Sequence, residues 1–194
     1  MLNDSLKCLL VMKIRLIALL VLALAVQGVM AQKYVTKTGK IRFYSDTPME
    51  KIEAVNNQVN SALDVATGQM VFRVLMKSFE FEKALMQEHF NENYVESDKF
   101  PNATFKGTVA GLQQLDMTKD GKHQVEVEGD LTIHGVTKKV KTTGTLEAKG
   151  GKIAGRCVFN VAVKDYGISI PTAVVKQIAE TIEITVDVTY EKMN

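Results

Sequence analysis

Tryptophan is absent from this 194-residue sequence, and histidine occurs three times and cysteine twice. None of the histidines (His89, His123 and His134) lies at short spacing from another, so no metal site is indicated. Cys157 would be the single cysteine left after removal of an N-terminal leader, and one cysteine excludes an intrachain disulfide. We therefore expect a fold stabilised by its apolar core, without a metal or a cofactor.

The sequence also lacks the patterns that carry catalysis. No glycine-rich phosphate loop is present, and no serine stands in a nucleophile-elbow context. Cys157 lies on an apolar row, which predicts a buried and inert thiol. Glu126 and Glu128 point outward from one strand and indicate a solvated face. We expect no catalytic residue and no enzyme activity, since a hydrolase or isomerase would need titratable groups that converge in a cleft.

The N-terminal segment has the layout of a secretory signal peptide. Lys13 and Arg15 precede an unbroken apolar run at 16–26, and Ala31 ends a plausible cleavage site of small and aliphatic residues. The run is shorter than the roughly 20 residues that a membrane-spanning helix needs. Met12, just before the basic residues, is an alternative start. We expect residues 1–31 to be removed and the mature protein to be periplasmic or secreted.

The remaining chain is neutral. Removal of the leader takes three of the 24 basic and one of the 22 acidic residues, which leaves 21 of each. This balance indicates neither nucleic acid nor an anionic membrane as a partner. The length suits one domain with a full core. We expect a single domain over residues 32–194.

Alternation of apolar and polar residues dominates this domain and predicts β-strands. In the clearest run, Thr181 to Tyr190, isoleucine, valine and tyrosine alternate with glutamate, threonine and aspartate. Turn signals such as Asp120-Gly121 and Gly150-Gly151 separate the runs. The other apolar rows, the last two of them weaker, occupy 125–133, 157–163, 70–76, 41–45 and 59–67.

One segment follows helical spacing instead. Between residues 82 and 90, four side chains fall within one arc: Leu85, Met86, His89 and Phe90. A second short helix or a turn is expected near 172–179. Seven or eight antiparallel strands with one or two short helices form a barrel or a sandwich. A membrane barrel would need aromatic girdles, and a chain with no tryptophan and five scattered tyrosines does not provide them.

Two segments stand out as motifs. The first is Gly129-Asp-Leu-Thr-Ile-His134-Gly135-Val-Thr-Lys-Lys-Val140, which predicts a strand, a tight turn at Gly135 and a second strand. The second runs from His89 to Gly107 and contains Phe100-Pro101-Asn-Ala-Thr-Phe105. With the strands that follow them, these motifs resemble the YceI-like family of polyisoprenoid-binding proteins.

The resemblance implies an all-β, antiparallel, lipocalin-like β-barrel of about eight strands, with a long apolar channel for an isoprenoid chain. Residues 33–63 depart from the family pattern, because they lack its usual histidine-containing opening strand. Helix residues are expected near the barrel, and inward positions are expected to line it. The ligand-binding residues expected on this basis are Phe72, Val74, Leu85, Met86, Phe90, Phe105, Leu131, Ile133, Phe159, Ile184 and Val186.

Inward side chains of a small barrel either fill it or leave room for one slender ligand. The alternation by itself favours a filled core, whereas the resemblance favours a cavity. The leading hypothesis is an exported protein that holds an isoprenoid or another long-chain lipid. The alternative is a structural or protein-interaction barrel of the cell envelope without a ligand. His134 is expected to form hydrogen bonds or to face solvent, and Leu131 and Ile133 are the better candidates for ligand contact.

Overall fold

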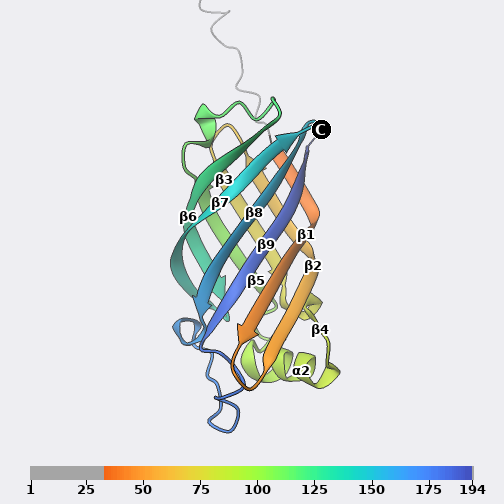
Figure 1. The fold of residues 1–194 in the computed structure, drawn as a ribbon, viewed down its shortest axis with the longest axis vertical. Helices are drawn as coiled ribbons and strands as arrows, with labels where there is room; N and C mark the ends of the chain where they lie inside the picture. The colour runs from red at the N-terminus through yellow and green to blue at the C-terminus, as the bar shows by residue number, and fades with distance from the viewer. Residues whose placement is uncertain (1–32, 194) are drawn as a thin grey trace, which may run out of the picture. The chain divides into compact units, whose positions relative to one another are not determined.

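The structure is a computed structural model that describes residues 33–193, so the predicted leader lies outside the described residues. Eight long antiparallel strands close into a barrel in the order β1-β9-β8-β7-β6-β5-β3-β2, and β2 pairs with β1 to complete the ring (Figure 1). The expected barrel of about eight strands is confirmed. The strands are β1 Lys33–Asp46, β2 Lys51–Asp64, β3 Gln69–Leu75, β5 Asn102–Val109, β6 Gly121–Ile133, β7 Val136–Lys149, β8 Lys152–Ala162 and β9 Thr181–Lys192, with the two-residue β4 Glu80–Phe81 beside β2.

Alternation determines which side chains enter the barrel. On β9, Ile182, Val186 and Tyr190 are buried, whereas Thr181 and Thr189 on the other face are exposed. Because successive side chains of a strand point to opposite faces, the apolar row faces inward along the whole strand. The strand pairs with β8 through residues 181–190 and with β1, so it is part of the closed wall.

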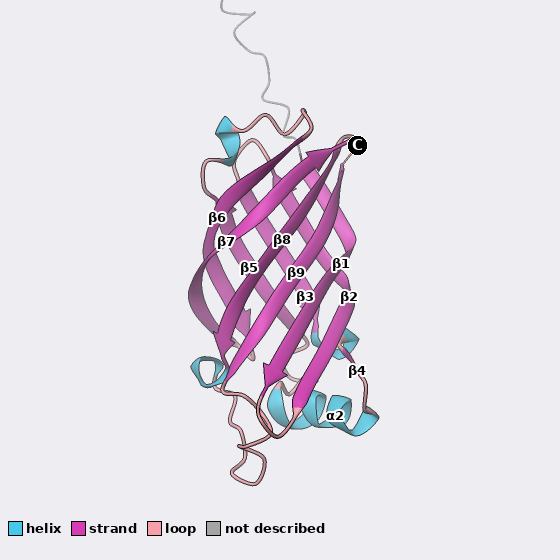
Figure 2. Ribbon diagram, in the orientation of Figure 1, coloured by secondary structure: helices cyan, strands magenta, loops and turns pink. Residues whose placement is uncertain are grey.

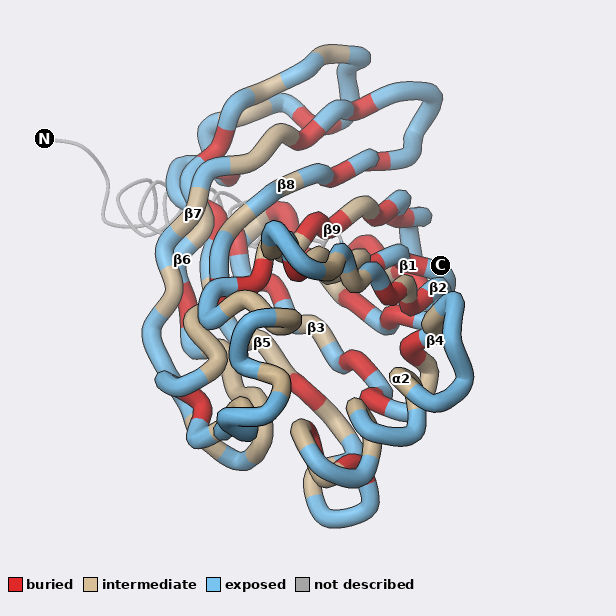
Figure 3. Tube along the Cα trace, turned by 60° about the horizontal axis from the view of Figure 1, so that its bottom comes forward, coloured by how far each residue is buried: buried red, intermediate tan, exposed pale blue. Residues whose placement is uncertain are grey.

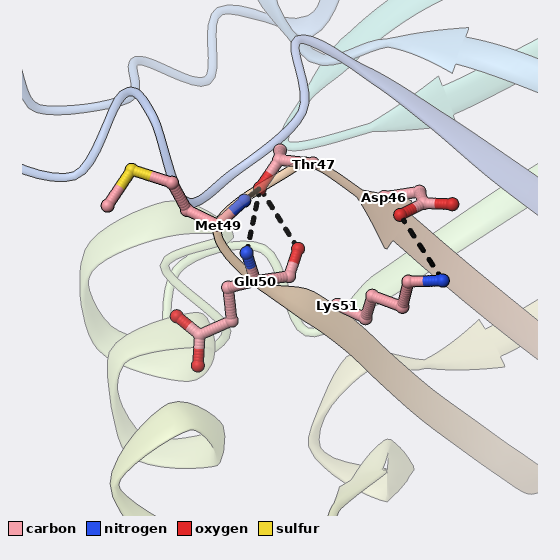
Figure 4. Close-up of polar contacts among 5 residues, drawn as sticks. All are labelled: Asp46, Thr47, Met49, Glu50 and Lys51. Carbon is pink, nitrogen blue, oxygen red and sulfur yellow. Dashed lines mark hydrogen bonds and ion pairs between the residues drawn. The ribbon is translucent and has the colours of Figure 1, made fainter.

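The early strands are longer than the sequence predicted. The weak rows at 41–45 and 59–67 belong to β1 and β2, which each have 14 residues. Between them, the Thr47 hydroxyl donates to the carbonyl of Glu50 and accepts from the backbone N–H groups of Met49 and Glu50 (Figure 4). A hydroxyl that satisfies a turn in this way fixes a tight reversal.

The β2–β3 contact is the shortest junction of the wall. Only residues 60–63 of β2 pair with β3, and nearer the start of β2, at residues 54–55, the partner is β4. At the split, the buried Asn56 side chain donates from Nδ2 to the carbonyl of Leu75 at 2.9 Å. A side chain therefore replaces the ladder hydrogen bond where the two strands diverge.

The two ends of the barrel differ. One end, which we call the closed end, is filled by five fully buried side chains from the strands and from η3 Leu112–Gln114: Val59, Leu63, Leu112, Ile153 and Tyr190. The other end, which we call the open end, carries the β1–β2 turn, residues 76–94 and residues 163–180 (Figures 2 and 3).

Apart from η3, the helical segments of the described chain lie at the open end. They are η1 Met76–Ser78, α2 Ala84–His89, η2 Phe90–Tyr94 and η4 Val163–Tyr166. The predicted helix at 82–90 is confirmed by α2, and the helical segment continues as η2 to Tyr94. Of the two forms expected near 172–179, the structure shows turns and no helix, with bonds such as Val174 N–H to Pro171 O and Gln177 N–H to Val174 O. Within residues 33–193, no helix is long and apolar enough to span a membrane.

Candidate functional site

The barrel encloses an apolar cavity of about 340 Å³ that extends toward the open end. Ten of the eleven residues expected from sequence line this cavity: Phe72, Val74, Met86, Phe90, Phe105, Leu131, Ile133, Phe159, Ile184 and Val186. They come from β3, α2, η2, β5, β6, β8 and β9, so the closed sheet brings together residues far apart in sequence. Several are only half-buried although they point into the barrel, because the cavity leaves their surfaces uncovered.

Leu85 is the exception and requires a correction. Its side chain is 61% exposed and lies outside the cavity lining, whereas its neighbour Met86 lines the cavity. A helix of six residues turns only a few side chains toward the barrel. The predicted inward face included Leu85, which the structure places outside it. Leu85 therefore lies on the outer face of α2.

Four phenylalanines at the open end form an aromatic cluster that the sequence prediction only partly identified. The Phe43 ring lies 5.7 Å from Phe79, 5.4 Å from Phe81 and 5.5 Å from Phe90, measured between ring centroids. Such separations are typical of favourable aromatic pairs. All four line the cavity, but only Phe90 was predicted. Phe43 could have been found from the row Ile41, Phe43 and Ser45, which the missing family pattern at 33–63 made hard to assign.

Phe105 occupies the inner surface where two glycines face each other across β5 and β6. Gly107 pairs with Gly129, and a Cβ built on them would lie 2.5 Å and 2.6 Å, respectively, from Cζ of Phe105. Only glycine at these positions lets the ring lie against the backbone. The Phe72 ring meets Phe105 edge to face at 6.3 Å, and both rings line the cavity.

Two polar groups of the cavity wall, Ser45 and Glu50, form hydrogen bonds with neighbouring segments. The Ser45 hydroxyl accepts from the backbone N–H of Ala179 at 2.9 Å, which ties the end of β1 to the segment before β9. The carboxylate of Glu50 accepts from the Lys83 ammonium at 3.1 Å. Cys157 lines the cavity as a free thiol, and burial raises its pKa to about 11. This thiol is therefore protonated and a poor nucleophile at neutral pH.

His134 forms a hydrogen-bonded clamp outside the cavity. Its Nε2 lies 2.6 Å from a carboxylate oxygen of Glu96, and its Nδ1 lies 3.1 Å from the carbonyl of Tyr166. A carboxylate and a carbonyl can only accept, so both bonds form when the ring carries both protons. The clamp joins the β6–β7 turn to the segment after η2 and to η4. The hydrogen-bonding role expected for His134 is confirmed.

The clamp also has unusual backbone geometry. Glu96 and His134 have φ of 43° and 51°, and they are the two non-glycine residues with positive φ in the described chain. Gly135 follows with φ of 75°, as a two-residue hairpin turn requires. A Cβ on Gly135 would lie 2.5 Å from the Phe100 ring, and that ring meets the His134 ring edge to face at 4.6 Å. Phe100 and His134 belong to the two sequence motifs, so these motifs are neighbours in space.

The histidines of the described chain lie in different surroundings. His89 lines the mouth of the cavity, whereas His134 is held in the clamp. The hydrogen bond from His134 lowers the pKa of Glu96, burial opposes this shift, and the charge of Lys99 adds to it. Among residues 33–193, no group of three or more histidine, cysteine, aspartate and glutamate side chains could hold a metal ion.

The fold and the cavity together define the class of protein. It is a lipocalin-like antiparallel β-barrel with an apolar interior that opens at one end. The model of the YceI-like domain matches residues 32–190. The chain belongs to this family. The resemblance found in the sequence is thereby confirmed.

Similar proteins support the assignment. A UPF0312 protein of Vibrio cholerae is 28% identical over 114 residues, which are 55% of this chain and 57% of that protein. The chain thus matches little more than half the length of this curated relative.

Solved structures share the fold. One is a polyisoprenoid-binding domain from Saccharophagus degradans that is implicated in plant cell wall breakdown. It superposes with a TM-score of 0.73 at 14% sequence identity, and the match covers 84% of this chain and 99% of that domain. BcnA of Burkholderia cenocepacia superposes with a TM-score of 0.66 at 16% sequence identity, and the match covers 79% of this chain and 96% of the BcnA chain.

Proposed function

We propose that the protein is a non-catalytic binding protein that holds one long apolar lipid, of the isoprenoid class, inside its barrel. The observation that carries this proposal is the cavity: phenylalanine, leucine and isoleucine side chains face an interior that they do not fill. A volume of about 340 Å³ lies in the range of small-molecule sites. The solved polyisoprenoid-binding domain of the same fold supports the ligand class.

The shape of the cavity favours a slender chain over a compact ligand. On β6, the lining runs from Val125 to Ile133, eight residue steps. At about 3.3 Å per residue and a strand tilt of about 40°, this corresponds to roughly 20 Å along the barrel axis. A volume of about 340 Å³ spread over that length leaves room for a single chain.

Burial alone can supply the affinity. Each methylene moved from water into an apolar site contributes about 0.8 kcal/mol, so about fifteen buried carbons contribute roughly 12 kcal/mol. Association costs roughly 4–15 kcal/mol. The balance favours long chains and disfavours short ones, because the cost is nearly constant whereas the gain grows with length.

Export belongs to the same proposal. The basic residues, apolar run and small residues of the first 31 positions support secretion to the periplasm or beyond. A water-soluble barrel in that compartment would shield a lipid that cannot cross water unaided. Fractionation of cells expressing the full chain, with mass determination of the mature N-terminus, tests this part.

Binding is tested directly by solvent extraction and by a matched pair of variants. Protein purified from cells that make isoprenoid lipids should release about one lipid per chain on extraction, detected by mass spectrometry. Leu131→Trp places an indole inside the cavity, and Val158→Trp places the same indole on the exposed outer wall. We expect the first to weaken binding of solanesol, a nine-unit prenol, by more than about tenfold, and the second to leave it unchanged.

Two results would contradict the proposal. One is protein that carries no lipid from any host and takes up no solanesol after delipidation. The other is equal binding by both tryptophan variants, which would place the lipid outside the cavity. A comparison of prenols of different lengths adds a third criterion, since affinity should rise with chain length until the cavity is full.

A further inference from the structure

Three large apolar side chains are exposed on the segments that the open end carries, and each precedes or follows a residue of the cavity wall. Met49 is 64% exposed and adjoins Glu50, Leu85 is 61% exposed and adjoins Met86, and Val175 is 43% exposed and adjoins Val174. We call Met49, Leu85 and Val175 the rim. The rim residues come from the β1–β2 turn, from α2 and from the segment before β9.

Hydrogen bonds hold these three segments together. The Glu50–Lys83 pair joins the turn to the start of α2, and the Ser45–Ala179 bond joins β1 to the segment that carries Val175. Figure 4 shows Met49 projecting from the turn, away from the Asp46–Lys51 ion pair. The rim residues therefore surround one opening and are not scattered over the surface.

We infer that the rim docks the open end onto a neutral lipid surface, so that a lipid passes between bilayer and cavity without crossing water. This inference rests on the proposed function. Two wall residues at the opening, Met86 and Val174, each have an exposed apolar neighbour in sequence, so apolar side chains occur on both sides of the rim, as a path for an apolar chain requires. Three separate side chains on short segments suit shallow insertion among lipid headgroups.

The charges around the opening favour a zwitterionic surface. Lys83 is paired with Glu50 and Lys51 with Asp46. On residues 163–180, the exposed Lys164 and Lys176 are balanced by the exposed Asp165 and Glu180, so no excess of positive charge faces anionic headgroups. The exposed side of the helical segment carries Glu82, Glu88 and Glu92. An acidic face repels an anionic bilayer, so docking should depend on apolar contact and change little with salt.

The wall of the barrel offers a matched control. Val158 lies in the middle of β8, is 46% exposed and is paired in the ladder with Thr185, away from the opening. Val175→Glu and Val158→Glu thus introduce the same charge at valines of nearly equal exposure. Leu85→Glu tests the rim independently on the helix.

The experiment measures flotation of the mature protein with phosphatidylcholine vesicles and the transfer of solanesol from these vesicles to a second vesicle population. Val175→Glu and Leu85→Glu should each lower the vesicle-bound fraction and the transfer rate about tenfold, whereas Val158→Glu should match the parent protein. Uptake of solanesol from detergent solution, without vesicles, should be equal in all four proteins.

The outcomes separate the two proposals. Equal flotation and transfer by the rim and wall variants would overturn docking through the rim, as would stronger binding to anionic than to phosphatidylcholine vesicles. If solanesol is still taken up from detergent, the proposed function stands while the docking inference fails. Loss of detergent uptake in the parent protein would instead remove the proposed function itself.

Discussion

The closed and open ends of the barrel both have inward-facing aliphatic side chains, but these side chains are buried to different degrees. On β6, Val125 is buried near the closed end, whereas Leu131 and Ile133 are only half-buried near the open end, although all three face inward. All three are aliphatic and point inward, so neither polarity nor orientation explains the difference. Burial depends on what lies across the barrel from each residue.

The closed end has partners that the open end does not. Leu112 enters from η3, and Tyr190 reaches across to Ser61, where the two hydroxyls lie 2.8 Å apart in a buried hydrogen bond. Burial also raises the pKa of Tyr190, which keeps the hydroxyl protonated. The comparison indicates a division of labour: one end supplies stability, and the other supplies space.

A pair of isoleucines on neighbouring strands tests this division most strongly. Ile153 on β8 is fully buried at the closed end, and Ile184 on β9 is half-buried and lines the cavity. Ile153→Ala should lower the free energy of unfolding of the delipidated protein by about 2–5 kcal/mol, since it leaves a void in a packed region. Ile184→Ala should cost about 1 kcal/mol, because its neighbours already border empty space. Urea denaturation of both variants measures the difference, and equal losses would refute the division.

The glycine pair beneath Phe105 gives the next largest effect. A Cβ at position 129 would lie 2.5 Å from Cα of Gly107, so Gly129→Ala forces the backbone or the ring to move. We expect a loss of about 1–3 kcal/mol in unfolding free energy and weaker lipid binding. Gly121→Ala is the control on the same strand, because its Cβ would meet only the movable His123 side chain at 3.2 Å. Thermal unfolding of both proteins should show a clear shift for the first alone.

The Glu96–His134 clamp should make the open end sensitive to acid. Its hydrogen bond lowers the pKa of Glu96 in the folded protein, so the stabilisation is complete above the unfolded pKa of a glutamate and is lost as the pH falls through the lower folded value. Glu96→Gln should therefore be less stable than the parent near pH 6 and should converge with it toward pH 3.

A similar carboxylate at the other end of the molecule serves as the comparison. Lys152 lowers the pKa of Glu191, but both side chains of that pair are exposed. Glu191→Gln should change stability less than Glu96→Gln at pH 6, because exposed pairs are screened by water. Urea midpoints across the pH range measure both, and a pH-independent gap between Glu96→Gln and the parent would contradict the assignment.

The smallest expected effect concerns the reactivity of the Cys157 thiol in the cavity, and testing it requires no substitution. Burial raises the pKa of Cys157 to about 11, so little thiolate is present at pH 8. Labelling of the native protein by a thiol reagent should be on the order of 100-fold slower than in urea. Solanesol should slow it further, because the thiol lines the site. Native labelling as fast as in urea would show that the cavity is open to water.

Strand periodicity predicted most of the fold and most of the lining. Inward parity on β3, β5, β6, β8 and β9 follows from alternation alone, so Phe72, Phe159 and Ile184 could be placed without coordinates. The number of strands left a barrel or a sandwich open, and the family resemblance favoured the closed barrel. What periodicity could not predict was whether inward side chains meet, because that depends on distances across the barrel.

The missed features have local causes. Leu85 and Met86 are neighbours on a helix too short for its phase to be read from hydrophobic spacing. Phe43 lies in the region that departs from the family pattern. Glu96 gave no signal at all, since its partner His134 is 38 positions away and their contact depends on two left-handed residues.

The split between β2 and β3 has a consequence for aggregation. Where two strands diverge, the backbone groups of each edge are left without partners and can pair with another chain. Here β4 pairs with Ala54 and Val55, and the Asn56 amide occupies the carbonyl of Leu75. The two residues of β4 and the Asn56 side chain therefore cover the backbone groups where β2 and β3 separate. The barrel wall can open beside the aromatic cluster and still leave few unpaired backbone groups to which the strand of another molecule could pair.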